Sequence, residues 1–128
     1  MPASTAVVNT GRAILTNRLK GSGTEPVYIA AGTGSTGVAL TDTALGAEVG
    51  SRVTGTSSQQ TTTTTGDTYR VTGTWTAASS YTIAETGLFD ASSSGNLFVR
   101  GVLASTISLA SGDSIAFTFN VQVTSSVV

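Results

Sequence analysis

Residues 81–102 read YTIAETGLFDASSSGNLFVRGV, which is two mainly apolar segments joined by a polar one. The polar segment, residues 90–96, consists of residues that favour turns, so we expect the chain to reverse there. The first apolar segment predicts a strand, and residues 97–103 predict a second strand that returns beside it. Because residues 97–103 are almost continuously apolar, we expect this second strand to be covered on both faces.

Five residues of this stretch have predicted structural roles. Gly87 is expected to form a tight corner, because glycine adopts backbone conformations that other residues resist. Leu88 and Phe89 follow it, and we expect at least one of them to fill the core. Glu85 is a carboxylate near the end of the predicted strand. We expect it to form an ion pair with Arg100 or to accept backbone N–H bonds.

Alternation of apolar and polar residues predicts further strands. In residues 67–76, Tyr69, Val71 and Trp75 fall on one face, and in residues 115–123 every second residue is apolar. This period of two is typical of strands that bury one face in an antiparallel sheet. Together with frequent turn signals, these strands predict a mainly β fold. The expected fold is an antiparallel β-sandwich, jelly-roll-like, with one short N-terminal helix.

Two segments between the predicted strands are less regular. Residues 41–48 predict a short helical turn, with Leu40 and Leu45 facing inward. Residues 59–65 are mostly threonine, and this composition fits either a strand or a mobile loop.

The first eight residues differ from the rest of the chain. Residues 1–8 predict an extended N-terminal arm that ends in Val7 and Val8. Such an arm can add a strand to the sheet edge of a neighbouring molecule, so both valines are candidate partner contacts. Residues 9–128 are expected to form a single β-sandwich domain, since a chain of 128 residues has the length of one domain.

Residues 10–20 are the best helix candidate. Asn9 or Thr10 can act as the N-cap, and Gly21 is a plausible stop signal. We expect an apolar helix face made of Ile14, Leu15 and Leu19. Half of the six cationic residues lie here, namely Arg12, Arg18 and Lys20. They fit either solvated helix charge or a docking face for an acidic partner.

The composition excludes several classes of function. The chain has no histidine and no cysteine, and its net charge is −1. Six scattered cations make a poor surface for nucleic acid, and no apolar run reaches the roughly 20 residues that span a membrane. We therefore expect neither nucleic acid nor a membrane as a partner. Charged residues are only 10% of the chain, which suits a protein that spends its life in an assembly.

Patterns that suggest chemistry are interpreted as structural. Residues 32–37 match G-x-G-x-x-G, but no helix is predicted directly after them, so we expect a glycine-rich loop at a sheet edge. No serine can be assigned a nearby base. We predict no catalytic residues, no metal, no cofactor and no small-molecule substrate. A sugar-binding surface would require exposed Tyr69, Trp75 and Tyr81, and we favour core packing for Trp75.

Several short segments, taken in order, carry a resemblance to a known group of proteins. They are NTGR at residues 9–12, VYIAAGTG at 27–34, TDTALGAEV at 41–49, ETGLFD at 85–90 and GDSI at 112–115. In this series the chain resembles a group of small tailed-bacteriophage virion proteins. Such proteins are β-sandwich structural components, found as capsid decoration (cement) proteins or as parts of tail fibres.

The resemblance implies a virion structural protein without enzymatic activity. Its more specific implication is a cement protein, made in the host cytoplasm, that binds and stabilises the assembled head shell from outside. The partners would then be the major capsid protein and copies of the chain itself, as a homotrimer. The alternative is a tail-fibre or tail-tip protein that contacts a receptor. A fibre chain is usually longer than this one and contains repeats or a coiled coil. The sequence predicts neither feature, which favours the cement protein over the fibre protein.

Overall fold

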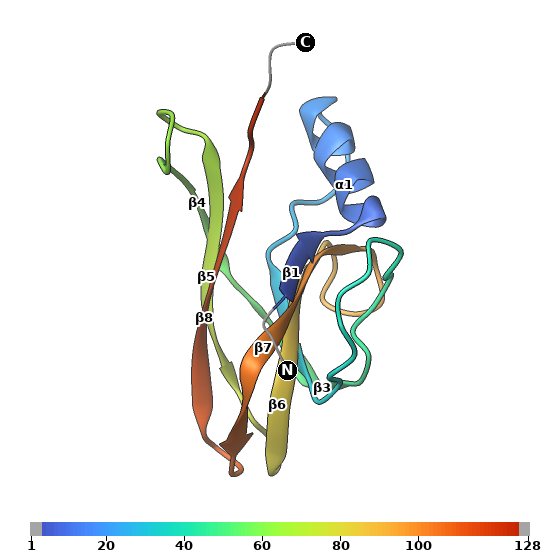
Figure 1. The fold of residues 1–128 in the computed structure, drawn as a ribbon, viewed down its shortest axis with the longest axis vertical. Helices are drawn as coiled ribbons and strands as arrows, with labels where there is room; N and C mark the ends of the chain where they lie inside the picture. Colours follow the sequence, from blue (N-terminus) through green and yellow to red (C-terminus); the bar gives the residue numbers. More distant parts are fainter. Residues whose placement is uncertain (1–3, 126–128) are drawn as a thin grey trace.

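The structure is a computed structural model that describes residues 4–125, and it confirms the predicted mainly β fold. Its elements are β1 (Ser4–Val7), α1 (Asn9–Leu19), β2 (Tyr28–Gly32), β3 (Glu48–Thr54), β4 (Thr56–Gln60), β5 (Thr68–Thr76), β6 (Tyr81–Phe89), β7 (Leu97–Leu109) and β8 (Ser114–Gln122). A five-stranded large sheet has the order β1-β7-β6-β2-β3, and a three-stranded small sheet has the order β4-β5-β8. Figure 1 shows the two antiparallel sheets as facing layers of a β-sandwich, with α1 beside one end of the large sheet.

The main core lies between the two sheets. It contains Trp75 of β5, Ile83 and Leu88 of β6, and Phe117 of β8. Each fully buried large apolar side chain contributes roughly 1.5–3 kcal/mol to folding. The alternation predicted for residues 67–76 and 115–123 is confirmed within β5 and β8, whose inward residues alternate with more exposed ones. Val123 lies beyond the end of β8 and is 58% exposed, so the alternation does not extend to it.

A second apolar cluster covers the other face of the large sheet. Phe89 belongs to it, since Phe89 and Leu88 alternate along β6 and point to opposite faces. The remaining buried members are Val8, Ala30, Leu45 and Leu97. Residues 33–47 run over this face, on the side away from the small sheet (Figure 1). Coverage of both faces explains why residues 83–89 and 97–102 are buried without interruption.

The predicted corner at Gly87 is wrong. Gly87 lies inside the continuous strand β6, between Ala30 of β2 and Arg100 of β7. Its φ is not positive, so conformational freedom is not what the position requires. A Cβ atom here would lie 2.9 Å from both Leu45 Cδ2 and the Val99 carbonyl oxygen. Close packing therefore accounts for the glycine.

Fewer residues of the predicted apolar helix face are buried than expected. Ile14 is buried, but Leu15 is 39% exposed and Leu19 is 80% exposed. The expected N-caps are also wrong, because Val8 precedes the helix as its cap residue and Asn9 already belongs to α1. The Thr10 hydroxyl instead donates a hydrogen bond to the Leu97 carbonyl, which joins the start of α1 to β7.

Gly21 ends the helix as predicted. Its φ is +89°, and its N–H donates to the Arg18 carbonyl at 2.9 Å. A positive φ is the conformation in which glycine is favoured directly after a helix. The next N–H, that of Ser22, donates to the Asn17 carbonyl at 3.0 Å.

The two irregular segments take non-helical forms. Residues 41–47 contain turns and bends, so the predicted helical turn is wrong, and Leu40 is 48% exposed whereas Leu45 is buried. In the threonine-rich segment, Gln59 and Gln60 end β4 and a turn follows. Asp67 holds this turn, because its carboxylate accepts the N–H groups of Thr62, Thr63 and Thr64.

The described part of the predicted arm belongs to the large sheet of its own chain. β1 pairs antiparallel with β7, with Ala6 opposite Arg100. Val8 continues the pairing, since its N–H donates to the Phe98 carbonyl at 3.2 Å. Residues 1–3 of the predicted arm and residues 126–128 of the predicted domain lie outside the described residues. The division into an arm and one domain stays a prediction.

Candidate interaction surfaces

Glu85 is the most constrained polar side chain of the central stretch. Its exposed fraction is 0%. Oε2 accepts the N–H of Gly34 at 2.8 Å and that of Ala47 at 2.7 Å, and Oε1 accepts the N–H of Gly46 at 2.7 Å. Oε1 also lies 3.0 Å from Arg100 Nη2. Glu85 thus forms both kinds of contact that the sequence suggested, the ion pair and the backbone bonds.

Arg100 completes this network from β7. Its side chain is 2% exposed, and its Nε donates to Glu85 Oε1 at 3.0 Å. Nη1 donates to Asp42 Oδ2 at 3.0 Å, and Nη2 donates to the Thr36 carbonyl at 2.9 Å. Every nitrogen of the guanidinium therefore has a partner within the chain, as buried charges require.

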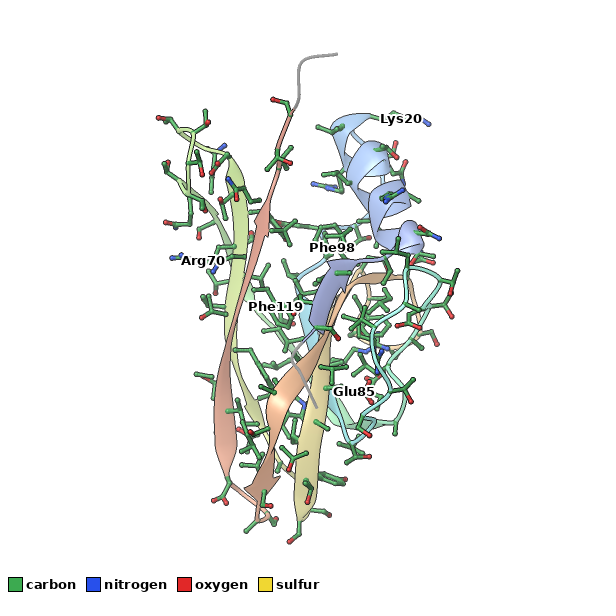
Figure 2. All side chains as sticks on the ribbon, in the orientation of Figure 1. Lys20, Arg70, Glu85, Phe98 and Phe119 are labelled. Atoms are coloured by element: carbon green, nitrogen blue, oxygen red, sulfur yellow. The ribbon has the colours of Figure 1, made fainter. Side chains whose placement is uncertain are left out.

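The Glu85–Arg100 network fastens residues 33–47 to the large sheet. Gly34, Thr36, Asp42, Gly46 and Ala47 all come from this segment. Figure 2 shows Glu85 on the side of the large sheet that this segment covers. Among the described residues, no buried side-chain nitrogen or oxygen lacks a hydrogen-bond partner. The network therefore serves the fold, and it offers no free group to a ligand.

The neighbouring apolar pair is buried on both faces of β6. Leu88 is 0% exposed and lies between the sheets, whereas Phe89 is 1% exposed in the outer cluster. The Arg52 guanidinium lies 3.6 Å from the centroid of the Phe89 ring, which is a cation–π contact. Both residues are therefore buried in the core. The sequence predicted this for at least one of them.

The candidate contact residues of the arm differ in their access to a partner. Val8 is fully buried, and Val7 is partly buried against the main core. In this conformation Val8 has no surface to offer. A contact through Val8 would require residues 4–8 to leave β7, so its role in partner binding stays a prediction.

The three cations of the predicted helix, two in α1 and one directly after it, lie on the surface. Arg12, Arg18 and Lys20 are all exposed. Arg18 Nη1 donates to the Gly23 carbonyl at 2.8 Å, which is a local contact after the helix. Lys20 lines a different hollow from Arg18. The structure therefore supports solvated helix charge, and a docking role for these cations stays a prediction.

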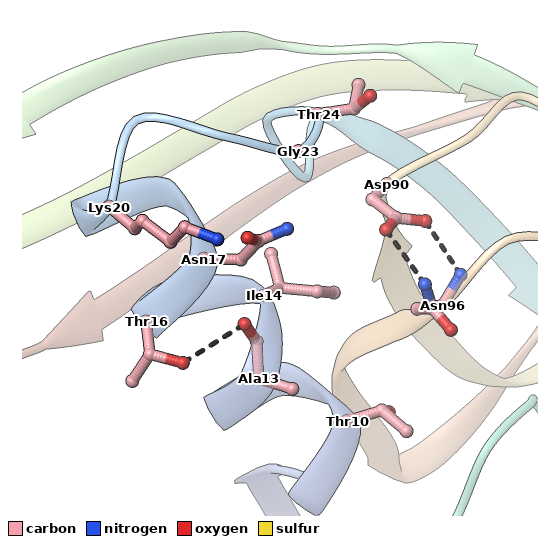
Figure 3. Close-up of a pocket in the computed structure, with 10 residues that line it drawn as sticks. All are labelled: Thr10, Ala13, Ile14, Thr16, Asn17, Lys20, Gly23, Thr24, Asp90 and Asn96. Carbon is pink, nitrogen blue, oxygen red and sulfur yellow. Dashed lines mark hydrogen bonds between the residues drawn. The ribbon is translucent and has the colours of Figure 1, made fainter.

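A hollow lies between α1 and the turn that joins β6 to β7. Its volume is about 520 Å³. Figure 3 shows its lining residues, which are Thr10, Ala13, Ile14, Thr16, Asn17, Lys20, Gly23, Thr24, Asp90 and Asn96. The Asp90 carboxylate accepts the Asn96 N–H at 2.7 Å and its Nδ2 at 3.1 Å. This acid therefore stabilises its own turn.

No metal-binding grouping is found in residues 4–125. No three of their Asp and Glu side chains gather as metal ligands would. Residues 33–37 form a loop as expected, but Gly32 ends β2 and the loop lies over the outer face of the large sheet, so the predicted position at a sheet edge is wrong. The loop contributes Gly34 and Thr36 to the Glu85–Arg100 network. Tyr69, Trp75 and Tyr81 do not form an exposed sugar-binding surface. Trp75 is fully buried, as the sequence favoured, and its Nε1 donates to the Ser51 carbonyl.

Tyr69 lies at the edge of an apolar groove between α1 and the small sheet. The groove has a volume of about 190 Å³ and is lined by Ile14, Leu15, Arg18, Glu25, Pro26, Tyr69, Phe98, Val121 and Val123. The Tyr69 hydroxyl lies 3.1 Å from Glu25 Oε1 and 3.1 Å from the Pro26 carbonyl oxygen. Burial, and then the charge of Glu25, raise the pKa of Tyr69 well above its usual value.

The open side of the sandwich was not anticipated from the sequence. A cleft of about 510 Å³ lies between β7 and β8 and includes Val102, Leu103, Phe117 and Phe119. The alternation of β8 was clear in the sequence, but its position at a sheet edge depends on the topology. One signal was available, because residues 114–122 contain no charged residue and no proline.

Comparison with known protein families gives a match over most of the chain. The family model described as podophage GP4 fiber I protein gp80 matches residues 8–124. The matched range begins at the residue before α1 and includes every strand except β1. No curated protein and no solved structure matches the chain. No helix among residues 4–125 is long and apolar enough to cross a membrane.

Proposed function

Because this chain belongs to the family of podophage GP4 fiber I protein gp80, we propose that it is a non-enzymatic fibre component of a phage tail. Membership makes it a structural protein of a phage virion. The single observation that carries the fibre assignment is the family match over residues 8–124. The family name supports the fibre alternative that the sequence left open, and we adopt it here as our proposal.

The described residues are consistent with a structural role. The Glu85–Arg100 network holds a long surface segment on the large sheet, and its polar atoms are satisfied internally. A part of a virion has to keep its shape while its neighbours bind to it. A sandwich whose sheets are both packed, with an anchored outer segment, has the necessary rigidity.

Capsid decoration is the second candidate function. It is favoured by the shape of the described chain, which forms a short sandwich without a coiled coil or a repeated unit in residues 4–125. In that role the exposed surface of the sandwich would contact the head shell. Binding to the assembled shell would then stabilise it by mass action.

Immunogold labelling of intact virions with an antibody raised against this chain distinguishes the two functions. Labelling of the tail is the expected result, and labelling spread over the head would establish the decoration role instead. An antibody that has been pre-absorbed with the purified protein is the control. Virions that carry the protein at neither place would overturn both proposals.

A further inference from the structure

The outer edge of β8 lacks the features that normally keep edge strands apart. β8 ends the small sheet, and within residues 4–125 no strand pairs with its other side. It is nine residues long, Ser114–Gln122, without a charge or a proline. Its register with β5 runs from Ser114 to Gln122 without a bulge. Native proteins protect exposed edge strands with charged residues, prolines and bulges. An edge strand that has none of these features is therefore suited to pairing with another strand.

The hydrogen bonds of β5 reveal which backbone groups of β8 face this edge. The Ala77 N–H donates to the Asp113 carbonyl, and the Val123 N–H donates to the Asp67 carbonyl, both at 2.8 Å. Odd-numbered residues of β8 therefore bond to β5, because bonding residues alternate along an antiparallel pair. The even-numbered residues, with Thr118 at the centre, direct their N–H and carbonyl groups to the open edge.

The sequence of β8 is symmetric in character about Thr118. Phe117 and Phe119 flank the centre, and Ile115 and Val121 follow at equal distances. Both phenylalanines are 8% exposed, and the exposed, partly buried and buried positions of β8 also read the same in either direction. An antiparallel copy of β8 centred on Thr118 would therefore place like beside like, with the apolar residues on the inner face of both copies.

Apolar surface next to this edge would gain cover from such a copy. The cleft between β7 and β8 is lined by Val102, Leu103, Phe117 and Phe119, and Val123 beyond the end of β8 is 58% exposed. Figure 2 shows Phe119 on the small sheet beside this open side. A sheet extended past β8 would shield these side chains from water, which is favourable in proportion to the apolar area covered.

We propose that β8 pairs antiparallel with β8 of a second copy of this chain, about a two-fold axis at Thr118. The two three-stranded sheets would then join into one continuous sheet. Such an interface is isologous, because the same edge is used by both copies. It differs from the homotrimer implied by the family resemblance, since the pairing uses both β8 edges and leaves none for a third chain.

The substitution Thr118→Lys tests the proposal. Thr118 is exposed, so one lysine is tolerated in a single chain, whereas in the pair the two lysines would lie directly opposite each other. Like charges opposite each other weaken strand pairing, and we expect the dissociation constant of the dimer to rise up to about fivefold. Thr72→Lys is the matched control, because Thr72 lies opposite Thr118 on β5, is exposed, and has no partner across the interface.

Sedimentation equilibrium over a range of concentrations gives the mass and the dissociation constant. The native chain should reach twice its mass of 12.8 kDa, and Thr72→Lys should match it. An equimolar mixture of Thr118→Lys and Thr118→Glu should regain the dimer, because the opposed charges then attract. A native chain that sediments as one or three chains, or equal behaviour of Thr118→Lys and Thr72→Lys, would overturn the pairing. These masses are independent of whether virions carry the protein on the tail.

Discussion

Glu85 shows how a single charged residue can organise distant parts of the chain. It lies on β6, yet it holds Gly34, Gly46 and Ala47, which are 38 to 51 positions away in sequence. The ion pair with Arg100 was accessible from the sequence, because the two residues lie on neighbouring predicted strands. The three N–H donors were not, since sequence patterns do not specify which loop folds over a given strand.

The substitution Glu85→Gln is expected to destabilise the fold by about 3 kcal/mol. It leaves the buried Arg100 with less compensating charge, and removing one partner of a buried pair is strongly unfavourable. Glu48→Gln is the matched control, because Glu48 forms a more exposed pair with Arg52. Its expected effect is no more than about 1 kcal/mol. Urea unfolding of both variants measures the difference, and equal losses would contradict the central role of Glu85.

At the scale of elements, prediction succeeded where a strand's own pattern determines its burial. β5 and β8 alternate with period two, and both formed as expected. Residues 1–8 were predicted as an extended arm able to pair with a neighbouring molecule, so the pairing of β1 within its own chain was not predicted. Its pairing with β7 depends on residues almost a hundred positions away. Helix α1 was located correctly, but only Ile14 of its predicted apolar face is buried.

A pair of proline substitutions tests the pairing of β1. The Val8 N–H bonds to Phe98, so the N–H of Ala6 faces β7 and that of Thr5 faces away from it. Ala6→Pro removes a bond within the sheet and should reduce stability by about 2–3 kcal/mol. Thr5→Pro should cost less than about 1 kcal/mol, because edge strands tolerate proline at outward positions. Thermal unfolding of both variants checks this, and a free arm would show no difference between them.

At the scale of the whole molecule, the two sheets differ in how their faces are covered. The large sheet is covered on both faces, by the small sheet and by residues 33–47 with α1 (Figure 1). The outer face of the small sheet is polar, with exposed Thr72, Thr74 and Thr118 beside a single arginine, Arg70. The low charge of the chain was visible in its composition. The sequence did not show that this low charge leaves an edge strand uncharged, because only the topology places β8 at the edge of the small sheet.

The pH dependence of global stability should have two limbs that belong to Asp67 and Tyr69. The chain has no histidine, the side chain whose ordinary pKa lies nearest neutrality. Backbone N–H bonds from Thr64 and Thr62 hold the pKa of Asp67 well below its usual range. Its contribution is therefore present above about pH 4 and is lost as the pH falls below that value.

The alkaline limb has the opposite sign. Burial and the nearby Glu25 raise the pKa of Tyr69, so its contribution is present below about pH 10 and is lost as the pH rises further. Unfolding midpoints measured from about pH 2 to pH 11 should fall at both ends. Asp67→Asn should flatten the acid limb alone, and Tyr69→Phe the alkaline limb alone, because each removes one titrating group. If either variant keeps the native slope at its own end, another group controls that limb.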